Sequence, residues 1–502
     1  MELADISEKL QRLIDDDPAK AISEALQLSG NINLELLKAA ILVDAGALVK
    51  NYEVVVEGVE IYRNAVSKYQ DNSELKYNLA NGLRALAQST AYTGFNWYRD
   101  TEDYRLEARK YFYVAANDNE ASFDIRSQSC TNLGNLLRSS YRWVEAYDFY
   151  TLALIQNPRN GMASSGALKI LKYALEQELG NHELLVKEIE FLAFHVDQNL
   201  ESIYTYSGSY GVKGIVDEIK DIPRVENDRS GVEGDEYEKF VVSHNLTLSP
   251  TIHSHPHESR YWDNINISSV NVGVGSDSSV PEIFAMINIL KSDYILARQL
   301  FFNASRRLFN ETGNYNDTLN YACYGVNESA LALAQRSALD ILDKVGVATS
   351  SYLGIGGAKR TSFKEAWFKK SKDEKNEFKP AIIQEIENGN VALLALTEVS
   401  RDLSNKMGFL SKKQTSRNSS THRFTVLHDL GGIPASHSGC LEHFEYEVFL
   451  RESLNTLKLA RSSVIYFVQM ILIREERLSE KKDGIVMPLF VPSYENIRGF
   501  DE

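Results

Sequence analysis

Residues 132–158, NLGNLLRSSYRWVEAYDFYTLALIQNP, decide the fold of the N-terminal half of the chain. Gly134, Ala146 and Ala153 are small residues at positions where two helices can approach each other closely. Tyr150 is a large aromatic residue that can fill the space between the helices, and Pro158 cannot continue a helix. The segment therefore predicts two helices that are joined by a short turn and packed tightly together.

The spacing of these residues matches the tetratricopeptide repeat, a helix–turn–helix unit. Two neighbouring segments fit the same frame, one with Gly46, Gly58, Tyr62 and Ala65 and the other with Ala80, Ala108, Phe112 and Ala115. A further helical pattern covers residues 167–199. We therefore predict a tetratricopeptide helical repeat array over residues 1–220. Such arrays stack into one core and present a concave face, so this array either binds a protein or peptide ligand or only scaffolds the rest of the chain.

Residues 221–280 lose this regular pattern and contain several prolines and glycines, which predicts a linker or an irregular docking segment. Two groups of possible zinc ligands occur in the chain. They are His253, His255 and His257 in this segment, and His437, Cys440 and His443 at the expected start of a long helix. Neither group has an obvious fourth ligand, so we expect no metal and no other cofactor.

After residue 280, apolar residues recur with a helical period in four long segments. These segments are residues 283–308, 321–345, 391–403 and 441–478. Their lengths and the polar stretches between them predict a four-helix bundle with long insertions over residues 281–502. Together with the repeat array, this predicts an all-α protein.

The sequence RNSSTH at residues 417–422 combines the groups that a metal-free ribonuclease needs. Arg417 stays charged at any working pH and can hold a phosphate with its fork of N–H donors. His422 titrates near neutral pH, so it can take a proton from a ribose hydroxyl or give one to a leaving oxygen. Asn418 can orient the arginine or the phosphate by hydrogen bonding. We predict that Arg417, Asn418 and His422 are the catalytic residues.

Two alternatives to this interpretation remain. Arg423 and His428 form a second pair with the same spacing, but Phe424 follows Arg423 whereas a polar amide follows Arg417, so His428 is the second choice. The second alternative is that the motif forms a solvated basic loop whose histidine packs or caps and has no catalytic role.

The motif also suits the start of a helix. If one of residues 419–421 caps a helix, Arg417 lies in the preceding loop and His422 lies in the first turn.

The charge of the C-terminal half suits an RNA substrate better than the net charge of −15 suggests. Residues 281–502 carry 28 Lys and Arg against 27 Asp and Glu, and no Asp or Glu lies between residues 403 and 428. Basic residues interleaved with aromatic ones can bind RNA by phosphate contact and base stacking, although residues 367–370 also fit a solvated insertion. The predicted RNA-binding residues are Lys412, Lys413, Arg423, Lys369, Lys370 and Trp367.

Cysteine usage and hydropathy predict a cytoplasmic protein. Cys130, Cys323 and Cys440 lie far apart, which suits a reducing compartment. The acidic N-terminus lacks the apolar run of a signal peptide. The longest apolar run, residues 464–473, is too short to span a bilayer, so we expect no membrane contact.

A helical bundle with Arg417-Asn418-x3-His422 before its long last helix resembles the HEPN superfamily of ribonucleases. The N-terminal repeats make the chain similar to a bacterial branch of that family that is linked to tetratricopeptide repeats. The resemblance implies metal-independent RNA cleavage in a toxin, stress-response or antiviral defence setting, by a homodimer whose facing motifs build one composite site. The competing hypothesis is a non-catalytic interaction protein, in which a repeat scaffold joins a helical dimerisation bundle that no longer cuts RNA.

Overall fold

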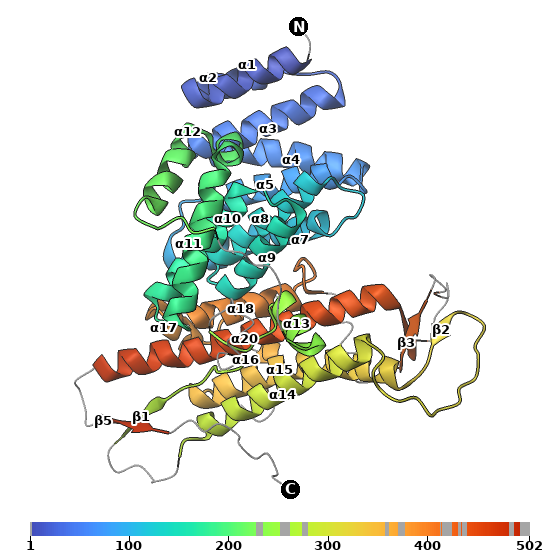
Figure 1. The fold of residues 1–502 in the computed structure, drawn as a ribbon. Helices are drawn as coiled ribbons and strands as arrows, with labels where there is room; N and C mark the ends of the chain where they lie inside the picture. Colours follow the sequence, from blue (N-terminus) through green and yellow to red (C-terminus); the bar gives the residue numbers. More distant parts are fainter. Residues whose placement is uncertain are drawn as a thin grey trace. The chain divides into compact units, whose positions relative to one another are not determined.

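The computed structural model describes residues 3–226, 234–250, 262–273, 280–356, 361–369, 377–411, 413, 424–429, 433, 439–480 and 486–491. The chain forms two compact units. The N-terminal unit comprises Met1–Gln177, Leu185–Asp228 and Arg401–Lys412, and the C-terminal unit comprises Glu178–Leu184, Arg229–Ser400 and Lys413–Glu502. Helices dominate both units, so the predicted all-α fold class is confirmed (Figure 1).

The N-terminal unit is built from helices that pack on their neighbours in the sequence (Figure 1). The helices are α1 (Leu3–Asp16), α2 (Pro18–Ala25), α3 (Ile32–Leu48), α4 (Tyr52–Lys68), α5 (Ser73–Ser89), α6 (Gly94–Asp100), α7 (Glu102–Ala116), α8 (Phe123–Ser139), α9 (Trp143–Gln156), α10 (Gly161–Glu176), α11 (His182–Gln198) and α12 (Leu200–Ile219). The pairs α3 with α4, α5 with α7 and α8 with α9 are in extensive contact, as expected for stacked helical hairpins. Their tetratricopeptide assignment stays a prediction.

Side-chain caps begin several of these helices. Before α3, α4, α5 and α10 stands an asparagine whose side-chain oxygen accepts a hydrogen bond from the backbone N–H three residues later, and Ser122 does the same for α8. Such a cap satisfies one of the N–H groups that a helix start leaves without an intrahelical partner. Asparagine therefore marks the start of four helices of this unit.

Tyr150 fills the space between α8, α9 and α10 in the N-terminal unit. Its side chain on α9 is fully buried, and its hydroxyl donates to Asn135 Oδ1 at 2.8 Å. A Cβ added to Gly134 on α8 would lie 2.8 Å from the Tyr150 ring, and a Cβ added to Gly166 on α10 would overlap the same ring. The glycines thus leave room for the aromatic ring, which is the role that the sequence pattern assigned to Gly134.

This packing makes Gly166→Ala destabilising. The added methyl group would press on the Tyr150 ring, and we expect the free energy of unfolding of the N-terminal unit to fall by about 1–3 kcal/mol in urea denaturation. Gly214→Ala on α12 is the matched control, because a Cβ there would meet nothing within 4 Å. The control should be neutral or stabilising by up to about 1 kcal/mol. Equal stability of the two variants would contradict the close approach at Tyr150.

The C-terminal unit contains the four predicted long helices, α14 (Glu282–Ser305), α15 (Val326–Tyr352), α18 (Val391–Ser404) and α20 (Tyr446–Glu480). Shorter helices are α13 (Glu236–Ser243), α16 (Phe363–Trp367) and α17 (Pro380–Glu387). Two helices start later than predicted, because residues 322–323 and 441–445 form strands. The strands are β1 (Ser269–Gly273) paired with β5 (Val486–Phe490), and β2 (Ala322–Cys323), β3 (Phe424–His428) and β4 (Leu441–Glu445) in one sheet.

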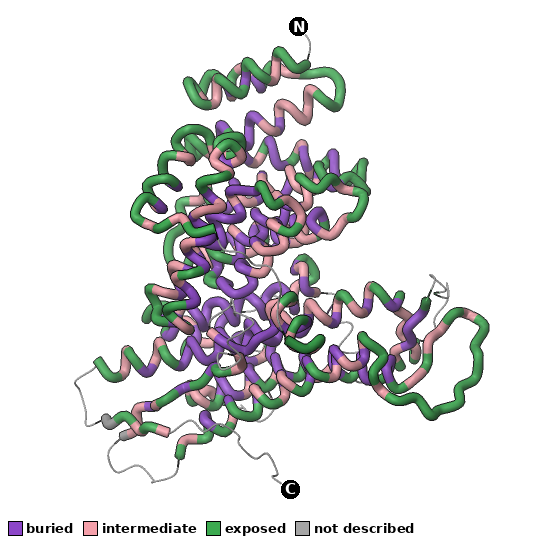
Figure 2. The backbone as a smooth tube through the Cα atoms, in the orientation of Figure 1, coloured by how far each residue is buried: buried purple, intermediate pink, exposed green. Residues whose placement is uncertain are grey.

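Helix α20 forms the core of the C-terminal unit. It packs along α14 and α15, and its residues from Leu457 to Ile471 are almost all buried (Figure 2). By length and composition alone α20 could cross a membrane, but 83% of its most apolar stretch is buried inside the structure. Burial on all sides, with polar residues at the helix ends, is typical of a core helix.

Part of residues 221–280, for which the sequence predicts a linker or docking segment, is buried in the C-terminal unit. The backbone of residues 246–248 is held by Arg298 Nη1, which donates to the Leu246 carbonyl at 2.7 Å, and by Arg461 Nε, which donates to the Thr247 carbonyl at 3.0 Å. Arg298 also forms a two-pronged ion pair with Asp263, at 2.9 and 2.6 Å. Arginines on α14 and α20 therefore fix this irregular segment to the bundle. His253, His255 and His257 lie outside the described residues.

Candidate functional site

The predicted catalytic residues Arg417, Asn418 and His422 lie outside the described residues, as do Lys412, Arg423 and Lys370. The described residues on either side of the motif define how the chain enters and leaves it. Lys413 is the last described residue before the motif, and β3 begins at Phe424 directly after it. Ten residues, 414–423, separate these two points.

Lys413 attaches the entry to the motif to α20. Its ammonium group donates to Glu452 Oε2 at 2.8 Å, to the Glu452 carbonyl at 3.1 Å and to Thr456 Oγ1 at 3.2 Å. The side chain is almost fully buried, and burial lowers the pKa of the amine. A buried lysine whose three donors are taken cannot hold a phosphate, so the prediction that Lys413 contacts RNA is wrong. Its place is structural.

Strand β3 attaches the exit from the motif to a small sheet. It pairs in parallel with β4, with Phe424 opposite Leu441, and antiparallel with β2, with Cys323 opposite Leu427. Residues 424–428 are therefore a strand. The interpretation that places His422 in the first turn of a helix requires helical residues at these positions, and the structure contradicts it there. Likewise, residues 441–445 form β4, so the predicted helix start around His437, Cys440 and His443 is wrong.

His428, the second-choice catalytic residue, is a fully buried histidine with both ring nitrogens in hydrogen bonds. Its Nδ1 lies 3.0 Å from the Asn320 carbonyl, and its Nε2 lies 2.7 Å from Nδ1 of His443 on β4. Because a carbonyl only accepts, Nδ1 of His428 carries a proton, and its Nε2 shares a hydrogen bond with Nδ1 of His443. This ring has no free nitrogen and no exposed surface for a substrate, so a catalytic role for His428 is wrong.

The predicted aromatic contact to RNA is also buried. Trp367 ends α16, a short helix that begins at a capping box of Ser362 and Glu365. The Trp367 side chain is fully buried and packs edge-on against Phe363, with 5.3 Å between ring centroids. Trp367 therefore cannot stack on a base, and this prediction is wrong. Lys369 remains half-exposed, with its amine 3.1 Å from Glu377.

Sequence reasoning missed the partners of these residues. Glu452 and His443 are separated from Lys413 and His428 by 39 and 15 residues, and no local motif marks either pair. Among the described residues, no group of three or more His, Cys, Asp or Glu side chains is arranged to hold a metal ion.

Comparison with protein families finds a match in the C-terminal half. Residues 274–475 match the family described as LA2681-like HEPN. This range of the C-terminal unit is therefore similar to a HEPN-superfamily domain. The matched range contains α14, α15, α18, most of α20, β3, β4 and the RNSSTH motif. HEPN domains are generally ribonucleases, and this supports a nuclease at the level of the superfamily. Neither the curated proteins nor the solved structures contain a match to the chain.

The Lys413 anchor predicts a specific loss of stability. Lys413→Ala removes three hydrogen bonds from a buried site, so we expect the free energy of unfolding of the C-terminal unit to fall by about 1–3 kcal/mol. Lys369→Ala removes an exposed ion pair and should change it by less than about 0.5 kcal/mol. Denaturant titration of both variants decides the point, and an equally small effect in both would show that Lys413 is not an anchor.

Proposed function

We propose that the protein is a metal-independent endoribonuclease of the HEPN type. The observation that carries the proposal is the position of the RNSSTH motif inside the range that matches the LA2681-like HEPN family. Two features of the described residues support it. In the sequence the motif lies between Lys413, which is ion-paired to Glu452 of α20, and the paired strand β3. The surrounding residues 403–428 contain no carboxylate side chain that would repel a phosphate.

In this proposal the residues of the motif divide the work of phosphodiester cleavage. His422 takes the proton from the ribose 2′-hydroxyl, whose oxygen attacks the adjacent phosphorus. Arg417 neutralises the charge that develops on the phosphoryl oxygens, and Asn418 orients the arginine or the phosphate. The 5′-oxygen leaves with a proton from a second His422. The products are a 2′,3′-cyclic phosphate and a 5′-hydroxyl, and no metal takes part.

Mutation of the motif separates this nuclease from a non-catalytic scaffold. His422→Ala and Arg417→Ala should each reduce RNA cleavage by at least about a hundredfold, because each removes a group that acts in the transition state. The melting temperature should stay near that of the wild type. His428→Ala is the control, because it breaks two buried hydrogen bonds and should act through stability.

Cleavage is measured on a labelled single-stranded RNA, alongside melting by circular dichroism. Full activity in folded His422→Ala together with no activity in folded His428→Ala would assign catalysis to His428 and contradict the role of His422. Unchanged cleavage in folded His422→Ala and Arg417→Ala would show that the motif does not act in catalysis, and a wild-type protein that cleaves no RNA would leave the scaffold hypothesis.

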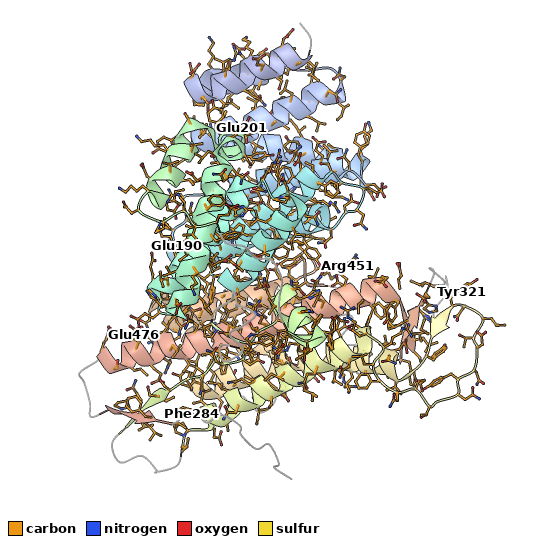
Figure 3. All side chains as sticks on the ribbon, viewed as in Figure 1. Glu190, Glu201, Phe284, Tyr321, Arg451 and Glu476 are labelled. Carbon is orange, nitrogen blue, oxygen red and sulfur yellow. The ribbon has the colours of Figure 1, made fainter. Side chains whose placement is uncertain are left out.

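A second protomer is part of the proposal, because one arginine and one histidine do not supply base, acid and charge neutralisation together. The apolar stripe of α20 is buried inside the unit, so a second copy would use another surface. Apolar side chains are exposed on either side of β2 and at the starts of β3 and α15, with Phe424 72% and Tyr321 65% exposed. Figure 3 labels Tyr321 next to this strand. Tyr324 and Val326 extend this surface. We propose that it faces its copy in a homodimer.

This surface gives a test of the dimer. Phe424→Lys should convert a dimer into a monomer in light scattering and should reduce cleavage in parallel, because the composite site is lost. Leu48→Lys is the matched control, since Leu48 is 61% exposed but lies on α3 in the N-terminal unit. A wild-type protein that is active and strictly monomeric would contradict the composite site.

The N-terminal unit completes the proposal as a regulator. Residues 1–280 carry 26 Lys and Arg against 42 Asp and Glu, which disfavours RNA binding there, and a helical array suits a protein or peptide ligand. We place the enzyme in the cytoplasm, in a toxin, stress-response or antiviral defence setting.

A further inference from the structure

Residues 401–412 belong to the N-terminal unit, although the residues before and after them belong to the C-terminal unit. This segment contains the end of α18 and the turn that follows it, and it leads to Lys413 and then to the RNSSTH motif. Its contacts inside the N-terminal unit are made with α7 and with Arg142, the residue before α9. The array therefore holds a piece of chain that comes shortly before the proposed catalytic residues.

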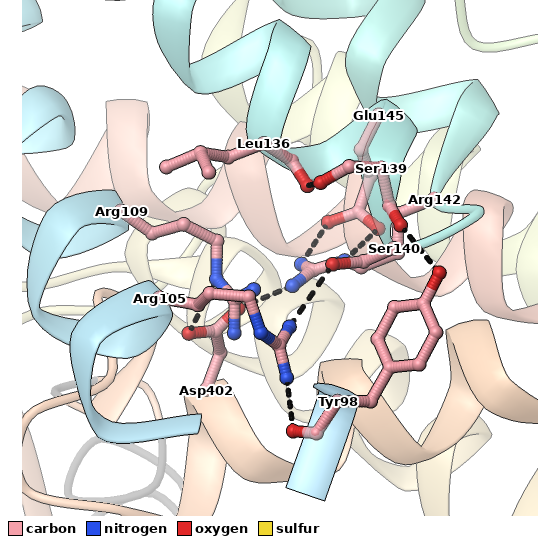
Figure 4. A network of polar contacts seen from close by, with 9 residues as sticks. All are labelled: Tyr98, Arg105, Arg109, Leu136, Ser139, Ser140, Arg142, Glu145 and Asp402. Atoms are coloured by element: carbon pink, nitrogen blue, oxygen red, sulfur yellow. Dashed lines mark hydrogen bonds and ion pairs between the residues drawn. The ribbon is translucent and has the colours of Figure 1, made fainter. Parts of the chain in front are cut away.

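Asp402 is the centre of these contacts. Its carboxylate accepts from Arg109 Nε on α7, at 3.2 Å to Oδ1, and forms a short ion pair with Arg142 Nη1 next to α9 (Figure 4). The side chains of Asp402, Arg109 and Arg142 are all buried. Arg142 also binds Glu145 through two hydrogen bonds, at 2.9 and 2.6 Å. The two arginines form a receptor for one carboxylate.

The rest of the segment fits the same place. Arg401 Nε lies 3.0 Å from Glu102 Oε2, and the Phe409 ring lies 5.2 Å from the Tyr113 ring and under the Arg142 guanidinium at 5.5 Å. Leu410 is buried. A Cβ on Gly408 would overlap the backbone of Asp402, so the turn folds back tightly. Residues 401–410 are therefore held in the N-terminal unit by both polar and apolar contacts.

The burial of the charges makes this docking depend on Asp402. Two buried guanidinium groups that lose their shared carboxylate keep their charge in a place from which water is excluded, and this is strongly unfavourable. Asp402 therefore contributes to the docking through its charge, whereas the Phe409 ring and Leu410 contribute apolar contact. An acidic segment from another protein could bind the same arginines only by displacing Asp402.

We infer that the N-terminal unit binds residues 401–412 through Asp402 and thereby positions the catalytic motif, with Asp402 as a positioning residue. The inference rests on the proposed nuclease function. Asp402 holds the start of the segment in the N-terminal unit. Lys413, the residue directly after the segment, is bound to Glu452 of α20. Four residues beyond Lys413 stands Arg417. Release of the segment gives the approach to the motif new freedom, and catalytic groups that lose their alignment lose rate.

The test uses three variants of the full-length protein. Asp402→Asn removes the charge that both arginines bind. Phe409→Ala weakens the docking without leaving a buried charge, and it serves if Asp402→Asn does not fold. Glu145→Gln is the matched control, because it removes a carboxylate from the same Arg142 but leaves Asp402 in place.

Two measurements are made on each variant. Hydrogen exchange of backbone amides in residues 403–411 should be at least about tenfold faster in Asp402→Asn and Phe409→Ala, and within about twofold of wild type in Glu145→Gln. On a single-stranded RNA, kcat should fall at least about tenfold with KM unchanged in the first two variants, because alignment changes and the RNA-binding residues do not.

The outcomes are distinguishable from those of the nuclease proposal. Unchanged exchange in folded Asp402→Asn would overturn the docking. Faster exchange with an unchanged or raised kcat would overturn the positioning role, as would an equal loss of kcat in Glu145→Gln. A wild-type protein that cleaves no RNA would remove the proposed function and the positioning role with it, whereas hydrogen exchange would still decide whether Asp402 docks the segment.

Discussion

The burial of α20 is the constraint on which the C-terminal unit depends. Three polar side chains on this helix each hold a segment that lacks long secondary structure. Glu452 binds Lys413, Arg461 binds the Thr247 carbonyl, and Glu475 accepts from both nitrogens of Asn271, at 2.6 and 2.9 Å. Buried polar groups need partners, so each of these contacts fixes its segment strongly. The core helix thereby sets the positions of the chain entering the motif, the docking segment and β1.

How far the sequence predicted this fold depends on the range of the interactions. The long helices follow from apolar periodicity, which is local, and the four predicted helices of the C-terminal half are present within a few residues. Strand β4 was missed because its five residues, LEHFE, also fit the beginning of the next helical stripe. Pairing with β3 decides in favour of a strand, and that pairing joins residues 17 positions apart.

The candidate site was predicted less well, for the same reason. Lys413 and Trp367 look like surface residues in a basic stretch, and only the fold reveals that Glu452 and the surrounding core bury them. His428 resembles a catalytic histidine until the Asn320 carbonyl and His443 occupy its two nitrogens. Asp402 gave no signal at all, because its arginine partners lie 293 and 260 residues away in the sequence. Local patterns predict what a residue can do, whereas its partners decide what it does.

The central claim is that the ribose 2′-hydroxyl attacks the adjacent phosphorus at the motif and that this cleavage needs no metal ion. The most direct measurement uses a short RNA with one strong cleavage position, incubated with the protein in excess EDTA, and compares it with the same RNA carrying a single 2′-deoxyribose at that position. The account predicts full cleavage of the first, with a 2′,3′-cyclic phosphate at the new end, and no cleavage of the second at that bond. Cleavage at the 2′-deoxyribose, or loss of all cleavage in EDTA that added Mg²⁺ restores, would contradict it.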